Sequence, residues 1–230
     1  MTTSLTVVKL GGRAQAECAD AVARLWRERP FGLVLVHGGG DEVSALQRVL
    51  GATPQFVGGR RVTTAGDIDV IRMALSGVTN KQLVAAFGAA GLRAIGLSGE
   101  DGGLIVADPS ADAAMGLVGT PATVNTTLLG LLLDAGYLPV ISPLAASSAG
   151  TGQALNVNGD DAAAAIAVAL GAAELFFMAD VPGVLVDGAP VASLDPDGAV
   201  ALAGPAGAST ASMSTGVSED REMAIRLRSA

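Results

Sequence analysis

Short apolar runs alternate along this chain with longer segments in which apolar residues recur at helical spacing. The short runs are rich in Val, Leu and Ile and are nearly continuous, as parallel strands covered on both faces are. We predict strands at residues 5–10, 33–37, 94–97, 138–142 and 175–179. We predict helices at residues 14–28, 41–51, 67–76, 80–90, 126–135 and 160–170. This alternation is typical of βαβ units and indicates an α/β fold with a mainly parallel sheet.

Other segments do not fit the βαβ pattern. Residues 56–64 and 102–124 predict short strands and hairpins that form a lid or rim over one end of the sheet, and residues 184–191 predict a further hairpin. The Ser, Ala and Gly residues at 145–152 mark a division between an N-terminal lobe, 1–150, and a C-terminal lobe, 151–230. Residues 204–218 are rich in Gly, Ala, Ser and Thr, which predicts a flexible loop, followed by a loosely attached terminal helix at 219–227.

Composition narrows the class of protein. With 230 residues the chain can bury a full core as one domain of two closely joined lobes. Its net charge of −8 argues against nucleic acid or an anionic membrane as the main partner. No apolar run approaches the roughly 20 residues of a membrane span, and residues 1–4 lack a basic signal start, so we expect a cytoplasmic protein. The single cysteine, Cys18, excludes an internal disulfide.

Two glycine-rich turns carry the first chemical signal. One predicted strand delivers Lys9 and then Gly11 and Gly12, and the next ends in the turn His37-Gly38-Gly39-Gly40. Glycine lets backbone N–H groups approach an anion closely, and Lys9 adds a positive charge at the same place. Two such turns side by side suit a polyphosphate. The loop at 96–103, after another strand, is either a third ligand-binding turn or simply a tight turn.

Polar residues elsewhere leave alternatives open. Arg60 and Arg61 stand in a glycine-flanked turn, where one of them can hold an acidic substrate, unless both are solvated surface residues. Asn158 or Asp160 caps the following helix, belongs to a site, or does both. We expect His37, the only histidine, to make a structural hydrogen bond rather than act as a base.

The sequence motifs of several enzyme classes are absent from this chain. The chain has no G-x-G-x-x-G fingerprint, no P-loop and no G-x-S-x-G nucleophile elbow. A protein nucleophile is not needed if the carboxylate of the substrate itself attacks.

Taken in order, seven motifs resemble the amino acid kinase family. They are Lys9-Leu10-Gly11-Gly12, His37-Gly38-Gly39-Gly40, Phe56-Val57-Gly58-Gly59-Arg60-Arg61-Val62-Thr63, Thr79-Asn80-Lys81, Gly96-Leu97-Ser98-Gly99 with Asp101-Gly102-Gly103, Asn156-Val157-Asn158-Gly159-Asp160, and Ala179-Asp180-Val181-Pro182-Gly183-Val184. The resemblance implies a single domain with a three-layer αβα sandwich and an open, mainly parallel sheet. Within the family it points to members that transfer the γ-phosphoryl group of MgATP to the side-chain carboxylate of N-acetyl-L-glutamate, giving an acyl phosphate in arginine biosynthesis.

The resemblance also implies residue roles, by matching position. Lys9 steadies the transferring phosphoryl group and Asp160 orients Lys9. The amides that line phosphate and substrate oxygens are those of Gly11, Gly12, Gly39 and Gly40.

Further positions carry over for the two substrates. The N-terminal lobe holds the amino acid through Gly38, Gly39, Arg61 for the α-carboxylate and Asn156 for the amide on the α side. The C-terminal lobe borders adenine and ribose with Asp180, Val181, Pro182 and Gly183. No protein side chain is assigned to a metal, because Mg²⁺ comes with the nucleotide. A homodimer that is not regulated by arginine is expected.

One departure from the family pattern lies late in the chain. The family has a second active-site lysine in a Gly-Gly-Met-x-x-Lys stretch, whereas residues 211–216 here end in Gly216, and no lysine follows Lys81. We expect a chain that is truncated or altered after about residue 204, as a frameshift would produce. Two alternatives accompany the main hypothesis: a kinase for a carrier-linked aminoadipate or glutamate, and, on the evidence of the missing lysine, a catalytically impaired member that binds ligand without turnover.

Overall fold

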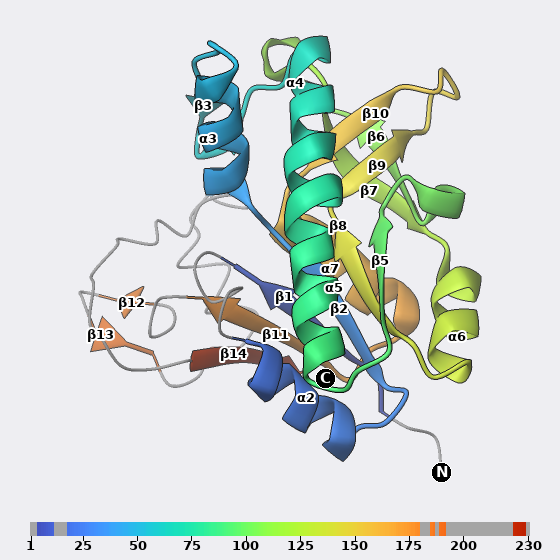
Figure 1. Ribbon diagram of the computed structural model, residues 1–230. Helices are drawn as coiled ribbons and strands as arrows, with labels where there is room; N and C mark the ends of the chain where they lie inside the picture. Colours follow the sequence, from blue (N-terminus) through green and yellow to red (C-terminus); the bar gives the residue numbers. More distant parts are fainter. Residues whose placement is uncertain (1–3, 12–17, 180–184, 187–188, 192–222, 229–230) are drawn as a thin grey trace.

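A six-stranded sheet forms the centre of the molecule (Figure 1). The computed structural model describes residues 4–11, 18–179, 185–186, 189–191 and 223–228. The sheet has the order β14-β11-β1-β2-β8-β5, in which five strands run parallel and β14 pairs antiparallel with β11. Its strands are β1 (Thr6–Leu10), β2 (Leu33–His37), β5 (Ala94–Ser98), β8 (Leu138–Ser142), β11 (Glu174–Ala179) and β14 (Met223–Arg228). The five strands expected from the sequence are all present, with bounds that differ by at most one residue.

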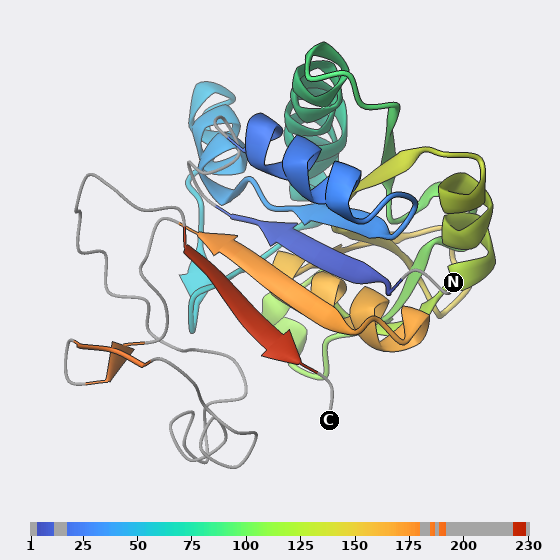
Figure 2. The same ribbon diagram turned by 90° about the horizontal axis from the view of Figure 1, so that it is seen from below.

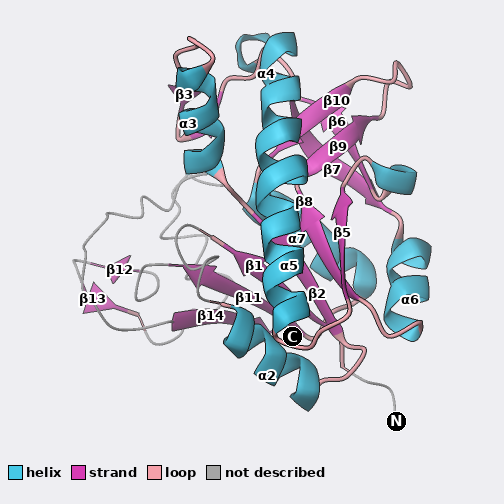
Figure 3. Cartoon of the chain, in the orientation of Figure 1, coloured by secondary structure: helices cyan, strands magenta, loops and turns pink. Residues whose placement is uncertain are grey.

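Helices cover both faces of this sheet (Figures 2 and 3). They are α2 (Ala19–Glu28) and α5 (Asn80–Ala89) on one face and α6 (Thr126–Asp134) and α7 (Gly159–Leu170) on the other. Within β1, Val8 packs with the α2 and α5 side and Val7 with the α6 and α7 side, because successive strand residues face opposite ways. Burial on both faces explains the nearly continuous apolar strands, and the expected three-layer αβα sandwich is confirmed.

One long helical rod runs past the sheet. It consists of α4 (Ala65–Ile71), the π-helix η1 (Arg72–Thr79) and α5, which follow one another without a break (Figure 1). Thr64 and Asp67 form a capping box that fixes its start. The separate helices predicted at 67–76 and 80–90 are therefore joined by a π-helical segment that the hydrophobic pattern does not reveal. The shorter helix α3 (Gly40–Val49) lies beside this rod.

A small closed barrel stands beyond the end of the sheet toward which β5 and β8 point (Figure 1). Its strands are β6 (Ile105–Pro109), β7 (Val118–Val124), β9 (Leu144–Ser147) and β10 (Ala154–Val157), and the single turns η2 (Asp101–Gly103) and η3 (Ala113–Met115) adjoin it. The hairpin expected at 102–124 is thus β6 and β7. Strands β9 and β10, at the connection 145–152, were not expected from the sequence.

Two short hairpins were expected and are present. In the first, β3 (Phe56–Val57) pairs with β4 (Arg60–Arg61) across Gly58 and Gly59, whose φ angles of 54° and 76° suit a two-residue turn. In the second, β12 (Leu185–Val186) pairs with β13 (Ala189–Pro190). No helix in the described part of the chain is long and apolar enough to cross a membrane.

The C-terminal prediction is wrong where the structure can test it. Residues 223–228 form strand β14, antiparallel to β11, and not part of a helix. The reason is visible in the sequence Met-Ala-Ile-Arg-Leu-Arg, which alternates larger apolar residues with Ala or Arg at the period of a strand. The loop predicted at 204–218 and residues 14–17 of the first predicted helix lie outside the described residues.

Candidate active site

The turns after β1 and β2 meet the start of α7. The backbone N–H of Gly38 donates to Leu10 O at 3.0 Å, which ties the second turn to the end of β1. A Cβ atom added at Gly159 would lie 3.5 Å from Lys9 Cε and 3.6 Å from His37 O. The start of α7 at Gly159 therefore lies in van der Waals range of Lys9 on β1 and of the turn after β2. The fold brings Lys9, Gly11, Gly38 and Asp160 to one place, as expected from the sequence.

An ion pair lies at this meeting point. Lys9 Nζ is 2.9 Å from Asp160 Oδ1, with the Lys9 side chain 17% exposed and that of Asp160 51% exposed. Asn158 caps α7, because its Oδ1 accepts from the backbone N–H of Asp160 at 2.7 Å and of Asp161 at 3.3 Å. Asn158 is thus the cap and leaves the Asp160 carboxylate for Lys9. The helix N-terminus and Lys9 together attract an anion.

The second turn begins α3 and needs one glycine for steric reasons. Gly39 has φ of 144°, and a Cβ atom there would lie 2.4 Å from Leu75 Cδ2. At Gly40, the first residue of α3, an added Cβ would meet no atom within 4 Å. Gly39 is therefore required by the fold, whereas Gly40 leaves open space beside the helix N-terminus.

A pocket of about 200 Å³ opens beside these turns. It is smaller than the roughly 300–1,000 Å³ of sites for drug-sized ligands, so it suits a small metabolite. Its walls combine the glycine turn after β2, the β3–β4 hairpin and the segment from β10 to α7. Among the lining residues are Gly38, Gly39, Arg60, Arg61, Asn156 and Asn158. The pocket thus gathers all of the positions expected to bind the amino-acid substrate.

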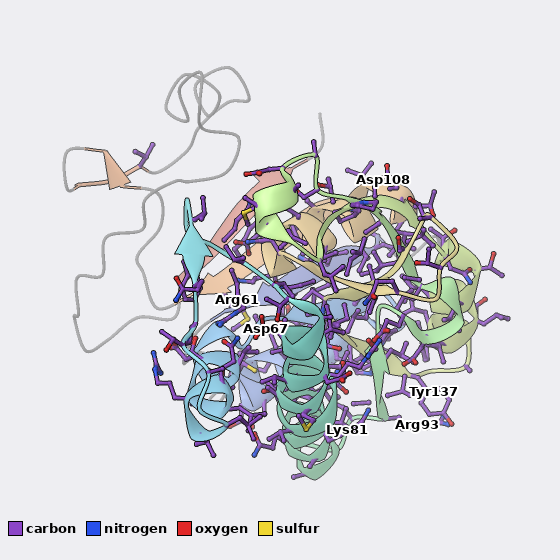
Figure 4. All side chains as sticks on the ribbon, turned by 90° about the horizontal axis from the view of Figure 1, so that it is seen from above. Arg61, Asp67, Lys81, Arg93, Asp108 and Tyr137 are labelled. Atoms are coloured by element: carbon purple, nitrogen blue, oxygen red, sulfur yellow. The ribbon has the colours of Figure 1, made fainter. Side chains whose placement is uncertain are left out.

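Arg61 is buried and held by α3. It is 8% exposed, and its Nη2 donates to Gly40 O at 2.8 Å and to Ser44 Oγ at 2.7 Å. Its Nη1 donates to Gln47 Oε1, and its Cζ lies 4.7 Å from the centre of the Phe56 ring. Burial lowers the pKa of Arg61, an effect that nearby Asp67 opposes. Figure 4 shows Arg61 and Asp67 close together at α4, well apart from Lys81.

Asn156 on β10 lines the same pocket from the barrel side. Its Nδ2 donates to Thr63 Oγ1 at 3.0 Å, and its backbone N–H donates to Leu117 O at 2.8 Å. Thr63 is fully buried and lies two residues after Arg61, the last residue of the hairpin. This hydrogen bond orients the Asn156 amide relative to Arg61.

His37 is a buried structural residue, as expected. Its Nδ1 lies 2.7 Å from Gly38 O, and its Nε2 lies 3.1 Å from Asn80 Nδ2. Because the Asn80 amide N–H₂ can only donate, Nε2 accepts, and the proton of the neutral ring sits on Nδ1 and binds Gly38 O. Burial lowers the pKa of His37 to about 4, so the ring is neutral at pH 7. These bonds fix the start of the glycine turn.

Two features of the site were not expected from the sequence. Arg60 Nη2 binds Asp161 Oδ2 at 2.8 Å and so joins the hairpin to α7. Thr79 at the end of η1 has a buried Oγ1 without a hydrogen-bond partner among the described residues, and it lies 3.5 Å from where a Gly39 Cβ would be. Five residues with expected roles lie outside the described part of the chain: Gly12, Asp180, Val181, Pro182 and Gly183.

The sequence model of the amino acid kinase family matches residues 4–196. The chain belongs to this family. The acetylglutamate kinase of Geobacillus kaustophilus is 46% identical over 189 residues, covering 81% of this chain and 72% of that protein. The acetylglutamate kinase of Methanopyrus kandleri is 44% identical over 189 residues, covering 80% and 74%.

Solved structures agree with the amino acid kinase fold. The protein smu.665 from Streptococcus mutans UA159 superposes with a TM-score of 0.74 at 30% identity, covering 80% of this chain and 76% of that one. The N-acetylglutamate synthase of Neisseria gonorrhoeae superposes with a TM-score of 0.69 at 24% identity, covering 83% of this chain and 45% of that one. The second likeness concerns the fold alone.

Proposed function

We propose that this chain transfers the γ-phosphoryl group of ATP to the side-chain carboxylate of N-acetyl-L-glutamate, a step of arginine biosynthesis. The observation that carries the proposal is the Lys9–Asp160 pair, set where two glycine turns and the start of α7 converge beside a pocket with two arginines. The relatives named acetylglutamate kinase, at 44–46% identity, support the choice of acceptor.

The proposed chemistry needs no protein nucleophile. A side-chain carboxylate oxygen of the substrate attacks the γ-phosphorus, the bond from that phosphorus to the β–γ bridging oxygen breaks, and ADP leaves with the electron pair. Phosphoryl transfer depends mainly on positioning and on stabilising negative charge. Lys9 supplies the charge, Asp160 holds its Nζ in place, and the amides of Gly12, Gly39 and Gly40 are proposed to donate to phosphate oxygens. The Gly11 N–H is bonded to Met178 O at 2.8 Å, so Gly11 lines the site without donating to the phosphates.

The acceptor is proposed to lie in the pocket. Its carboxylate and amide groups would meet Arg61, Asn156 and the turn at Gly38 and Gly39, all of which line the walls. Arginine keeps its charge even where burial lowers its pKa, so a buried guanidinium remains a strong partner for a carboxylate.

The residues of the site also fit MgATP. The N-terminus of α3 offers backbone N–H groups to phosphates, and Mg²⁺ usually reaches such sites through nucleotide oxygens and water. In the described part of the chain no three His, Cys, Asp or Glu side chains are grouped to hold a metal. We propose that Mg²⁺ arrives with the nucleotide, as it usually does at phosphate sites, and that Asp180, Val181, Pro182 and Gly183 border adenine and ribose. A homodimer in the cytoplasm completes the proposal.

Trapping the acyl phosphate with hydroxylamine tests this function. The purified chain is incubated with MgATP and, in separate reactions, N-acetyl-L-glutamate, L-glutamate and L-2-aminoadipate. We expect hydroxamate from N-acetyl-L-glutamate in large excess over the other two acceptors. Equal or greater yield from either unacetylated acceptor would contradict the proposed substrate. Calorimetric binding of N-acetyl-L-glutamate without any hydroxamate would instead identify a catalytically impaired member.

A further inference from the structure

Asn80, the first residue of α5, lies outside the pocket but is fully buried behind the glycine turn that follows β2. Its amide reaches three neighbouring strands of the sheet. Asn80 Nδ2 lies 3.1 Å from His37 Nε2 on β2 and donates to Val140 O on β8 at 2.9 Å. On β5, a Cβ atom added at Gly96 would collide with Asn80 Oδ1, so glycine at position 96 makes room for this amide.

The orientation of the Asn80 amide is fixed by its partners. Lys81 Nζ, which can only donate, lies 3.0 Å from Asn80 Oδ1 and 3.0 Å from Gly96 O. Val140 O can only accept, so Nδ2 faces it, and the other Nδ2 hydrogen points to His37 Nε2. His37 therefore accepts at Nε2 and carries its proton on Nδ1.

The Nδ1 proton of His37 sets the plane of the peptide between Gly38 and Gly39. Nδ1 lies 2.7 Å from Gly38 O. The C=O and N–H of a trans peptide point in opposite directions, and the described residues include no cis peptide. Because Gly38 O faces the ring, the Gly39 N–H points away from it. This N–H has no hydrogen-bond partner among the described residues, and Gly39 lines the pocket.

We propose that Asn80 is a positioning residue for phosphoryl transfer, because by fixing the proton of His37 on Nδ1 it turns the Gly39 N–H toward the phosphates. The inference rests on the proposed function and deepens it. Lys81 holds the Asn80 amide in the orientation that this requires. The series Lys81, Asn80 and His37 thus connects the start of α5 to the bound nucleotide without touching it.

Asn80→Asp reverses the direction of the hydrogen bond at Nε2. A carboxylate only accepts, so it draws a ring proton to Nε2, and its charge raises the pKa of His37 above the wild-type value of about 4. Below that raised pKa the imidazolium keeps Nδ1–H on Gly38 O. Above it, the remaining proton stays beside the carboxylate and Gly38 O loses its partner. The direction of the Gly39 N–H should then depend on pH in the variant but not in wild type.

The other charges near His37 are the same in both proteins. Lys81 on α5 acts on the ring electrostatically. Strand β8 is uncharged, and on β1 Lys9 is paired with Asp160 of α7. On α3, Glu42 Oε2 lies 3.3 Å from where a Gly39 Cβ would be. Comparing the variant with wild type at each pH therefore cancels the titration of these groups and of the nucleotide.

Nitrogen NMR of the imidazole and calorimetry of MgATP binding, both at a series of pH values, test the inference. His37 is the only histidine, so its ring signals need no assignment. Wild type should carry a proton on Nδ1 throughout. The Kd of Asn80→Asp should be close to that of wild type wherever NMR shows Nδ1 protonated. Wherever that proton is absent, the Kd should be about 10- to 100-fold higher, the value of one charge-assisted hydrogen bond.

Asn125→Asp is the matched control for the added charge. Asn125 also caps or fastens its surroundings through both amide atoms, since Oδ1 accepts from Leu128 N–H at 3.1 Å and Nδ2 donates to Gly102 O at 3.0 Å, but it does not line the pocket. Its Kd relative to wild type should not vary with pH.

A purely structural role of Asn80 predicts a different pattern. Asn80→Asp would then lower the free energy of unfolding, while its Kd for MgATP would not follow the protonation of Nδ1, and that result would overturn the inference. A wild-type ring protonated only on Nε2 would overturn it as well.

If Asn80→Asp does not fold, His37→Asn and His37→Leu decide. Their side chains branch alike, and Asn Nδ2 stands as many bonds from Cα as His Nδ1, so Asn can still donate to Gly38 O. His37→Asn should bind MgATP nearly as wild type does, and His37→Leu about 10- to 100-fold more weakly. Equal Kd values for the two variants would overturn the inference.

The readouts separate this inference from the proposed function. If wild type binds MgATP but does not phosphorylate N-acetyl-L-glutamate, the proposed function fails, while the Kd values still decide the role of Asn80. If wild type is active and the Kd of Asn80→Asp does not follow Nδ1, the function stands and the positioning role fails. A wild type that does not bind MgATP overturns both.

Discussion

Adding one methyl group at Gly40 separates the role of the second glycine turn in binding from its role in folding. An added Cβ at Gly40 meets no atom within 4 Å, and Gly40 is the first residue of α3. Gly40→Ala should therefore leave the free energy of unfolding unchanged or raise it by up to about 1 kcal/mol. The methyl would nevertheless fill the space that a phosphate oxygen needs. Losing one charge-assisted hydrogen bond, worth about 1.5–3 kcal/mol, raises KM for ATP by about 10- to 150-fold.

Gly39→Ala is the contrasting variant. Its φ of 144° is strained for any residue with a Cβ, and the new atom would lie 2.4 Å from Leu75 Cδ2. Strain and overpacking together should lower the free energy of unfolding by about 2–6 kcal/mol. Urea unfolding and steady-state ADP release measure both variants. A Gly40→Ala protein with wild-type stability and wild-type KM would refute the reasoning, because no ligand oxygen would then approach this helix N-terminus.

Three further predictions concern the surroundings of the site. Burial lowers the pKa of His37 from 6.5 to about 4, so between these pH values the unfolded chain binds a proton that the folded chain excludes. The free energy of unfolding should therefore be at its full value above pH 6.5 and fall by about 3 kcal/mol as the pH drops to 4. Urea unfolding of wild type against His37→Gln measures it, and a difference that does not vary with pH would contradict it. Thr79→Val should raise the melting temperature, because the buried Thr79 Oγ1 has no hydrogen-bond partner among the described residues. Thr63→Val should instead lower the free energy of unfolding by about 1–2 kcal/mol, because the Thr63 hydroxyl is bonded; calorimetry showing both variants equally stable would be inconsistent with this contrast. Asp160→Asn should lower kcat about tenfold with KM for ATP little changed, because Lys9 loses its orienting partner; a changed KM with unchanged kcat would argue against that role.

The central strands were predictable because burial on both faces makes their residues uniformly apolar. Strands β9 and β10 were not, since each has four residues, including Ala, Ser or Asn, and owes its pairing to a barrel formed by strands distant in sequence. The segment at 223–228 combines apolar and charged residues, and its composition alone is compatible with a helix or a strand. Its strict alternation, and the free edge of β11 beside it, favour the strand.

In the candidate site, too, the sequence predicts which motifs meet but not how their single side chains pair. The glycine turns, Lys9 and Asp160 stand in recognisable motifs, so their convergence was expected. The pairing of Arg60 with Asp161 joins residues 101 positions apart, and nothing in two adjacent arginines tells which one is fastened to α3. Only tertiary packing determines that α3 holds Arg61 and α7 holds Arg60.

The most direct test of the account is the rate of acyl phosphate formation from N-acetyl-L-glutamate and MgATP at saturating substrate, in wild type and in Lys9→Ala. Removing one preorganised charge donor from a phosphoryl-transfer site should lower kcat by about 100- to 1,000-fold, with KM for the acceptor little changed. A Lys9→Ala protein that keeps the kcat of wild type, or a wild type that forms no acyl phosphate, would contradict the claim that phosphoryl transfer takes place at Lys9.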